Sequence, residues 1–296
     1  MSDSVPSPAA ERPSCSAGEV TRGETAGGAS LPARLANAPI ELFGQFADAS
    51  NATLLVRLRD RDERTLADLA ESLGMGVDQL DIGDLDPSDL AVYKPQRGEQ
   101  PLADFAQGTL HLREVAAALV CDALGWQLVP PTVIRQDGPF GVGSLQQFVA
   151  HDLEQDYFTL LAGDDKTVID GLKMMVVFDL LVNNADRKAG HVLALSTTSL
   201  CDLWPVRLID HGLTFAVEDK LRTVAWDFAG EPLPAQAQID LARVGKDLGG
   251  ELGERLAGLL SIEEIEALRH RAQVLIDSPQ FPAPPTHRRP FPWPLY

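Results

Sequence analysis

The chain has 296 residues, of which 45% are hydrophobic and 23% are charged, and its formal net charge is −18. This acidic excess repels phosphate backbones and anionic lipid headgroups, which argues against nucleic-acid binding and against stable membrane association. Three cysteines without a CxxC spacing argue against a disulfide framework or a zinc site. Because neither a signal-peptide pattern nor an apolar run of about 20 residues occurs, we expect a cytoplasmic protein.

Both ends of the chain differ in composition from its middle. Residues 1–31 contain mostly Ser, Ala, Gly, Pro and Glu, which predicts a disordered N-terminal tail. Residues 279–296 are rich in proline but also contain Phe, Trp and Tyr. Such a segment is expected either to pack in an extended form on the body of the chain or to bind an aromatic-lined groove of a partner.

The first part of the body is rich in strand patterns. Short apolar runs separated by turn-forming residues predict strands at 40–43, 53–58, 90–94, 129–134 and 141–149. Residues 61–88 are acidic and polar, so we expect an insertion or a loop there.

One helix is expected among these strands, over residues 110–124, with Thr109 as its N-cap and Gly125 directly after its end. Glu114 shares a face of this helix with small apolar residues, namely Ala117, Ala118 and Cys121. A solvated face more often carries charged residues, so this pattern indicates that Glu114 faces protein and needs a partner. Our hypothesis for that partner is Lys94.

The second part of the body is mainly helical. The apolar pattern predicts a buried helix over 168–182, a strand over 203–209 and further helices within 234–278. The sequence therefore predicts an α+β fold with two lobes, a β-rich N-lobe over 32–149 and an α-helical C-lobe over 150–278.

Two acidic motifs follow buried elements of the C-lobe. Asp186 lies in the polar loop NNADRKAGH, and Asp210 ends an apolar strand within LIDHG. Phosphoryl transfer needs a metal ion held by carboxylates and a group that orients or deprotonates the acceptor hydroxyl. Asp210 fits the first role and Asp186 the second. Each alone is explained as well by capping of a turn, and it is their pairing that favours catalysis.

The pairing of NxDRxxGH with IDHG resembles the phosphatidylinositol 3-/4-kinase-like branch of the protein-kinase-like superfamily, including a group of related actinobacterial proteins. HipA-like kinases share similar loops. The resemblance implies a two-lobed kinase-like fold, with ATP and Mg²⁺, or alternatively Mn²⁺, as cofactors. It places Asp210 as a metal ligand, assisted by His191 or Asn184. It also implies that Arg187 or Lys188 neutralises the charge on the transferring group.

The resemblance further implies an ATP site in the N-lobe. Lys94 falls where such kinases hold the ATP phosphates, and Glu114 falls where the ion-pair partner of that lysine lies. The remaining implied positions are Gly44, Ser50 and Asn51 in a phosphate-covering hairpin, and Gln147, Phe148 and Val149 at a hinge that contacts adenine. Two positions depart from the family pattern, because His191 replaces an asparagine and His211 replaces a phenylalanine. Imidazole suits softer ions than Mg²⁺.

These observations predict an ATP- and Mg²⁺-dependent phosphotransferase that acts on a soluble protein or small-molecule hydroxyl. Asp179, inside the predicted buried helix, is expected to hold the catalytic loop by accepting backbone N–H bonds. Two alternatives stay open: a pseudokinase that serves as a nucleotide-binding regulatory scaffold, and an enzyme of the same fold that transfers AMP.

Overall fold

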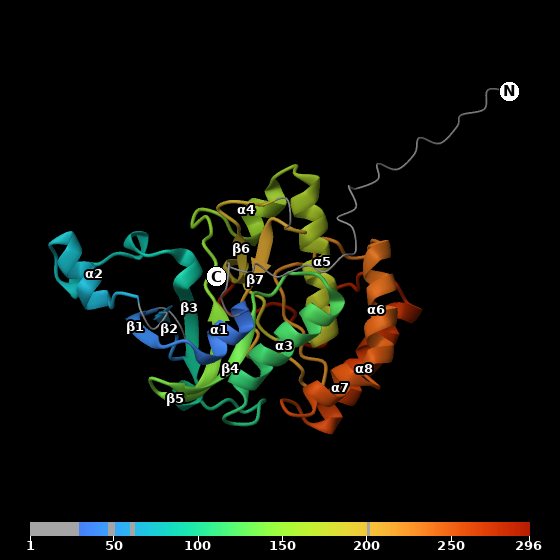
Figure 1. Cartoon of the computed structure of the whole chain (residues 1–296). Coiled ribbons are helices and arrows are strands. Elements are labelled where there is room, and N and C mark those ends of the chain that lie inside the picture. Colours follow the sequence, from blue (N-terminus) through green and yellow to red (C-terminus); the bar gives the residue numbers. More distant parts are fainter. Residues whose placement is uncertain (1–29, 47–50, 60–62, 200–201) are drawn as a thin grey trace.

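The structure, a computed structural model, describes residues 30–46, 51–59, 63–199 and 202–296. The described chain forms a lobe built on one antiparallel sheet and a second, mainly helical lobe (Figure 1). This is the predicted two-lobed α+β fold. The predicted tail falls almost wholly outside the described residues, and Leu31 already belongs to helix α1 (Leu31–Asn37).

The N-lobe sheet has five strands in the order β1-β2-β3-β5-β4, and all neighbouring strands are antiparallel. They are β1 (Ile40–Gln45), β2 (Leu54–Leu58), β3 (Leu90–Pro95), β4 (Thr132–Gly138) and β5 (Gly141–Gln147). All the strands predicted for this lobe are therefore confirmed. β4 begins later than predicted, because Pro130 and Pro131 cannot donate ladder hydrogen bonds.

The register of the central strands fixes the position of Lys94. Lys94 pairs with Ser144 of β5, and Pro95 pairs with Gly143. A Cβ atom added at Gly143 would lie 2.4 Å from the carbonyl oxygen of Lys94. Only glycine therefore allows β3 and β5 to approach this closely at the lysine.

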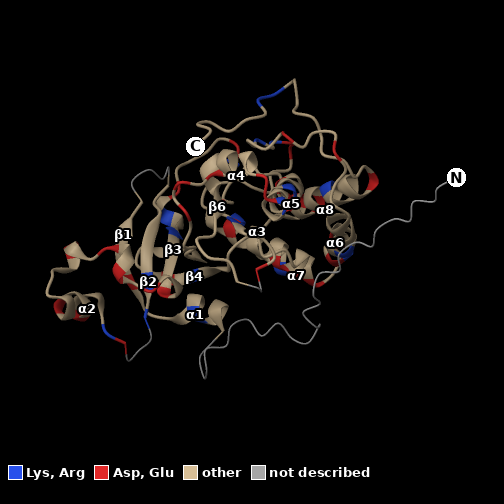
Figure 2. Cartoon of the chain, turned by 90° about the horizontal axis from the view of Figure 1, so that it is seen from above, with Lys and Arg blue, Asp and Glu red and all other residues tan. Residues whose placement is uncertain are grey.

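The segment between β2 and β3 contains more structure than predicted. It forms helix α2 (Leu66–Leu73), which begins with a reciprocal capping box between Thr65 and Asp68. Three short 3₁₀ turns follow, at Val77–Gln79, Ile82–Asp84 and Pro87–Asp89. Both views place α2 beyond β1, away from the helices of the C-lobe (Figure 1 and Figure 2). Of the two expectations for this segment, an insertion or a loop, the structure shows an insertion with its own helix, because the capping box and the buried Leu66 support a helix in an acidic stretch.

Helix α3 (Leu110–Leu124) is confirmed, and it packs against both lobes. It contacts β4 and β5 of the sheet as well as two C-lobe helices, α6 (Ala235–Asp247) and α7 (Glu251–Leu256). Gly125 ends it in a left-handed conformation at φ 73°. Thr109 occupies the N-cap position as predicted, but its side chain makes no capping hydrogen bond, and its hydroxyl donates to the Ala106 carbonyl oxygen at 2.6 Å.

The C-lobe surrounds one long buried helix. This helix, α5 (Lys166–Val182), is mostly apolar and mostly buried from Gly171 to its end. The other elements are α4 (Tyr157–Ala162), α8 (Ile262–Asp277) and the two-stranded sheet of β6 (Val192–Ala194) and β7 (Val206–Leu208). β7 begins later than predicted because Pro205 precedes it and has no N–H group.

The proline-rich C-terminal segment packs on the body of the chain, which was one of the two expectations for it. Phe281 is buried, and the Pro290 carbonyl accepts the Thr223 N–H at 3.0 Å. The Leu295 carbonyl accepts the Ala189 N–H at 2.8 Å. This segment therefore reaches the loop that contains Asp186.

Candidate active site

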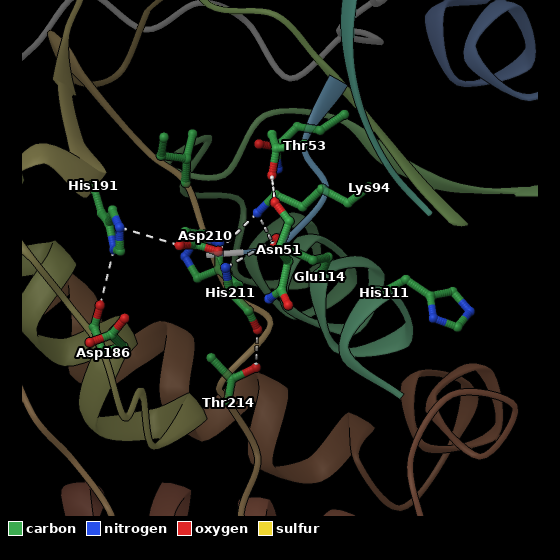
Figure 3. Close-up of polar contacts among 12 residues, drawn as sticks. Asn51, Thr53, Lys94, His111, Glu114, Asp186, His191, Asp210, His211 and Thr214 are labelled. Carbon is green, nitrogen blue, oxygen red and sulfur yellow. Dashed lines mark hydrogen bonds and ion pairs between the residues drawn. The ribbon is translucent and has the colours of Figure 1, made fainter. Parts of the chain in front are cut away.

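The centre of the site is a lysine that joins the two lobes. Lys94 Nζ lies 2.5 Å from Glu114 Oε1 on α3 and 2.9 Å from Asp210 Oδ1 in the C-lobe (Figure 3). The Glu114 side chain is 4% exposed, so its charge needs this cation. The predicted partnership of Lys94 and Glu114 is present in the structure. Burial alone would lower the pKa of Lys94, but Asp210 and Glu114 outweigh it and raise the pKa above its usual value.

Asp210 lies at the end of the short β7 strand, in an uncommon backbone conformation. Its φ of 60° is left-handed, a region that a residue other than glycine adopts only when its surroundings hold it there. His211, the next residue, helps to fix this backbone conformation, because its N–H donates to Glu114 Oε2 at 3.0 Å. Burial would raise the pKa of Asp210, but the charge and hydrogen bond of Lys94 outweigh it and hold the pKa well below its usual range. Asp210 is therefore a stable anion, and 45% of its side chain is exposed.

Asp186 lies in the loop between α5 and β6. Its side chain is 23% exposed, and Oδ2 lies 3.4 Å from Lys188 Nζ. Burial is the main reason that the pKa of Asp186 is raised to about 6, with Lys188 acting against it and Asp210 adding to it. A carboxylate with this pKa can accept a proton near neutral pH, as a general base must.

The loop is held from behind by a buried ion pair. Arg187 is 0% exposed, and its guanidinium donates twice to the carboxylate of Asp179 on α5, at 2.8 and 3.0 Å. It also donates to the carbonyl oxygens of His191 and Ile209, at 3.1 and 2.9 Å, and to His211 Nε2 at 2.9 Å. The hypothesis that Arg187 neutralises the charge on the transferring group is wrong, because the guanidinium is buried and its charge is paired with the Asp179 carboxylate. Lys188 is left as the cation beside Asp186.

Asn184 is also placed behind the loop and not beside Asp210. It is 0% exposed. Its Nδ2 donates to Asp179 Oδ1 at 3.0 Å, and its Oδ1 accepts the Asp186 N–H at 2.9 Å. Its suggested role as a metal ligand is therefore wrong, because both ends of the amide are occupied. Asp179 does hold the loop, but its carboxylate does so through the side chains of Arg187 and Asn184 instead of backbone N–H groups.

His191 lies between the two carboxylate-bearing segments (Figure 3). Its Nε2 is 3.2 Å from Asp210 Oδ2, and its Nδ1 is 3.0 Å from the Asp186 carbonyl oxygen. Burial lowers the pKa of His191 to about 4, although Asp210 acts in the opposite direction. The ring is therefore neutral at physiological pH, which is the form that binds metals.

Asp210 and His191 are spaced as two neighbouring ligands of a divalent metal ion would be. Two adjacent ligands of an octahedral ion at about 2.1 Å lie about 3 Å apart, close to the 3.2 Å between His191 Nε2 and Asp210 Oδ2. Within the part of the chain that the structure describes, no group of three or more His, Cys, Asp or Glu side chains could hold a metal by itself. Any ion here would therefore need further ligands from substrate or water.

The remaining predicted positions lie in the N-lobe and at the junction of the lobes. Gly44 pairs with Leu55 next to an irregularity of β1, and Ser50 lies outside the described residues. Asn51 Oδ1 accepts the Gln100 N–H at 2.7 Å. Gln147, Phe148 and Val149 follow one another from the end of β5 toward the C-lobe. Contact of these residues with nucleotide stays a prediction.

Sequence reasoning overlooked Arg113, which connects α3 to the C-lobe. Its Nη1 donates to the Thr214 carbonyl oxygen at 2.6 Å, and its Nη2 pairs with Glu264 of α8. Thr214 in turn donates its hydroxyl to the His211 carbonyl oxygen at 2.6 Å. The signal in the sequence was an arginine directly beside Glu114 in a helix whose other residues are apolar except for His111 and Asp122.

Comparison with known proteins identifies a family by sequence. No family model matches the chain. Protein Rv2133c of Mycobacterium tuberculosis is 40% identical over 294 residues, which cover 88% of this chain and 94% of that protein. The chain belongs to the Rv2133c family. The narrower resemblance to phosphatidylinositol 3-/4-kinase-like proteins stays a prediction.

Three solved structures resemble the chain more distantly. The Golgi casein kinase with Mn/ADP bound has a TM-score of 0.48 and 15% identity, over 83% of this chain and 74% of that one. The Helicobacter pylori proinflammatory kinase CtkA has a TM-score of 0.45 and 13% identity, over 83% and 94%. Hydra Fam20 with sugar has a TM-score of 0.43 and 13% identity, over 83% and 86%. Likenesses this low assign no activity to the chain.

Proposed function

We propose that the chain is an ATP-dependent phosphotransferase that moves the γ-phosphoryl group to a hydroxyl acceptor. The observation that carries this proposal is the contact of Lys94 with both Glu114 and Asp210. A lysine on the third strand of the sheet, paired with a glutamate of the next long helix and close to a metal-binding aspartate, is the arrangement that protein kinases use.

Each charged side chain then has a role. Lys94, held by Glu114, binds phosphate oxygens of ATP, and Asp210 with His191 would hold a divalent ion. Such an ion, when bound, neutralises charge on the phosphate oxygens. Lys188 lies beside Asp186, where it can bind the transferring group.

Asp186 is the proposed base of the reaction. The acceptor oxygen forms a bond to the γ-phosphorus while the bond from that phosphorus to the bridging oxygen of ADP breaks. The proton of the acceptor hydroxyl passes to the Asp186 carboxylate. Asn184 and Arg187 orient this carboxylate indirectly by holding the loop from behind.

For the acceptor, we propose a soluble protein or small molecule with a hydroxyl group. The net charge of −18 disfavours approach of polyanions. No helix in the described ranges is long and apolar enough to cross a membrane.

A thermal-shift titration tests nucleotide binding. Wild type and Asp210→Asn are titrated with ATP in the presence of Mg²⁺ or Mn²⁺, with Asp277→Asn, an exposed residue at the end of α8, as the matched control. A ligand that binds the native state raises the melting temperature. We expect a metal-dependent rise in wild type and in the control, and none with Asp210→Asn. Absence of a rise with either metal would refute the ATP site.

Labelled ATP then separates phosphoryl transfer from its alternatives. Label from the γ-phosphate on the chain or on an added protein acceptor supports the kinase activity. Label from the α-phosphate would instead identify AMP transfer. Nucleotide binding without transfer of either label to any acceptor would identify a pseudokinase scaffold.

A further inference from the structure

The contacts of His191 determine which of its nitrogen atoms carries the proton. Nδ1 lies 3.0 Å from the carbonyl oxygen of Asp186, which can only accept a hydrogen bond. A proton on Nδ1 satisfies this contact. With the proton on Nε2, two acceptors would face each other at 3.0 Å, and the Lys188 N–H, at 3.5 Å, would be only a weak donor to Nδ1. The geometry therefore favours the tautomer protonated at Nδ1.

In this tautomer, the lone pair of His191 Nε2 faces a lone pair of the Asp210 carboxylate on the side of the ring opposite to Nδ1. Nε2 presents its lone pair to Asp210 Oδ2 at 3.2 Å. Lys94 does not separate them, since its ammonium group contacts the other oxygen, Oδ1. A cation between Nε2 and Oδ2 would satisfy both atoms.

His191 also makes the second hydrogen bond, on the side away from the metal, that is typical of metal-binding histidines. Such a histidine donates its second ring N–H to a backbone carbonyl or a carboxylate, which fixes the ring and its tautomer. Here the acceptor is the backbone carbonyl of Asp186, the proposed base. The orientation of the nitrogen ligand is thus coupled to the loop that performs the chemistry.

We propose that His191 and Asp210 bind the nucleotide-associated metal ion as a nitrogen–oxygen pair, and that the nitrogen ligand makes this site prefer Mn²⁺ to Mg²⁺. The proposal rests on the function proposed above, because phosphate oxygens supply further ligands. Mg²⁺ strongly prefers oxygen ligands. Mn²⁺ accepts carboxylate and phosphate oxygens in an octahedral geometry and, as a first-row transition ion, also binds imidazole nitrogen.

Pulsed electron paramagnetic resonance on the full chain with Mn²⁺ and ADP tests the ligand directly, because nitrogen bound to Mn²⁺ modulates the spin echo. We compare wild type with His191→Asn and with His270→Asn, an exposed histidine on α8 that serves as the matched control. The signal of free Mn²⁺ during Mg²⁺ competition gives the ratio of the two metal affinities. Circular dichroism without metal checks that each variant folds, and His191→Gln serves as a second variant.

We expect coupling to a bound imidazole nitrogen in wild type and in the control, and its loss with His191→Asn. The preference for Mn²⁺ over Mg²⁺ should fall by roughly tenfold in the same variant. Bound Mn²⁺ and ADP without that coupling, or an unchanged preference in a folded His191 variant, would overturn the metal inference while leaving the phosphotransferase proposal intact. No binding of Mn²⁺ with ADP by wild type would overturn both.

Discussion

Two carboxylates on either side of His191 have pKa values that move in opposite directions. Burial raises the pKa of Asp186 to about 6. For Asp210, the charge and hydrogen bond of Lys94 outweigh the effect of burial and lower the pKa. When the pKa values of two neighbouring acids are shifted in opposite directions, the acid with the higher pKa suits proton transfer, and the other suits binding of a cation as a stable anion. Side-chain environment therefore assigns the base to Asp186 and the anionic ligand to Asp210.

The raised pKa of Asp186 predicts a pH-dependent effect on stability. Because the folded pKa, about 6, exceeds the ordinary value of 3.8, ionisation of Asp186 opposes folding, and this cost grows as pH rises from about 4 to above 6. In metal-free protein, Asp186→Asn should raise the free energy of unfolding by about 1–3 kcal/mol at pH 8 and by about half as much at pH 5. Urea unfolding at both pH values measures this. A gain in stability that is the same at both pH values would contradict this prediction.

At the scale of elements, the two loops of the site depend on one buried guanidinium. Arg187 joins Asp179 on α5 to the backbone of His191 and Ile209. These partners belong to the loops that carry Asp186 and Asp210. The position of both carboxylates therefore depends on an ion pair that contacts neither.

Breaking this ion pair should be costly. Arg187→Met leaves the Asp179 carboxylate buried without its cation, and we expect a loss of about 3–5 kcal/mol in the free energy of unfolding. The double variant with Asp179→Leu should lose less than the sum of the two single variants, because it removes both charges. Urea unfolding measures these values, with the exposed Arg255→Ala as a control. Additive losses would show that the pair does not act as a unit.

The C-terminal segment supports the same region through backbone bonds. Deletion of residues 286–296 removes the acceptors of the Ala189 and Thr223 N–H groups, the carbonyls of Leu295 and Pro290. We expect these two amides to exchange faster with deuterium in the shortened chain. The amide of Leu208, which donates to the Leu128 carbonyl at 2.8 Å, should stay protected. Unchanged exchange at both Ala189 and Thr223 would contradict the supporting role.

At the scale of the whole molecule, α3 fixes the position of one lobe relative to the other. Its buried residues share one large core with the C-lobe helices, while a separate smaller core fills the N-lobe sheet. Arg113 adds polar contacts from α3 to Thr214 and Glu264. Because the same helix carries Glu114, the distance between Lys94 and Asp210 depends on how α3 packs.

A substitution that weakens the packing of α3 should therefore weaken nucleotide binding, although it changes no residue of the proposed nucleotide site. Arg113→Met leaves Glu264 and the Thr214 carbonyl without their partner, and we expect a loss of about 1–3 kcal/mol in the free energy of unfolding. The rise in melting temperature given by ADP with Mn²⁺ should also be smaller than in wild type. Calorimetric scans with and without ligand measure both effects. A stability loss with an undiminished ligand shift would show that α3 packing does not control the site.

The sequence by itself determined the strands of the N-lobe, the helices α3 and α5 and the two acidic motifs, but not α2, α4 or β6. Apolar runs and turn residues were sufficient for the predicted segments, because these form where local pattern and burial agree. The order of Lys94, Glu114, Asp186 and Asp210 along the chain was also sufficient to propose which side chains act together.

Only the tertiary structure decided which polar residues of the loops face the site. Arg187 and Asn184 lie next to Asp186 in sequence, yet both point to Asp179 behind the loop. No local pattern distinguishes an arginine that binds phosphate from one that neutralises a buried carboxylate. The difference depends on where a distant helix places its charge, and a buried aspartate must be paired. The tautomer of His191 was decided in the same way, by a carbonyl oxygen that only the folded loop brings to its ring.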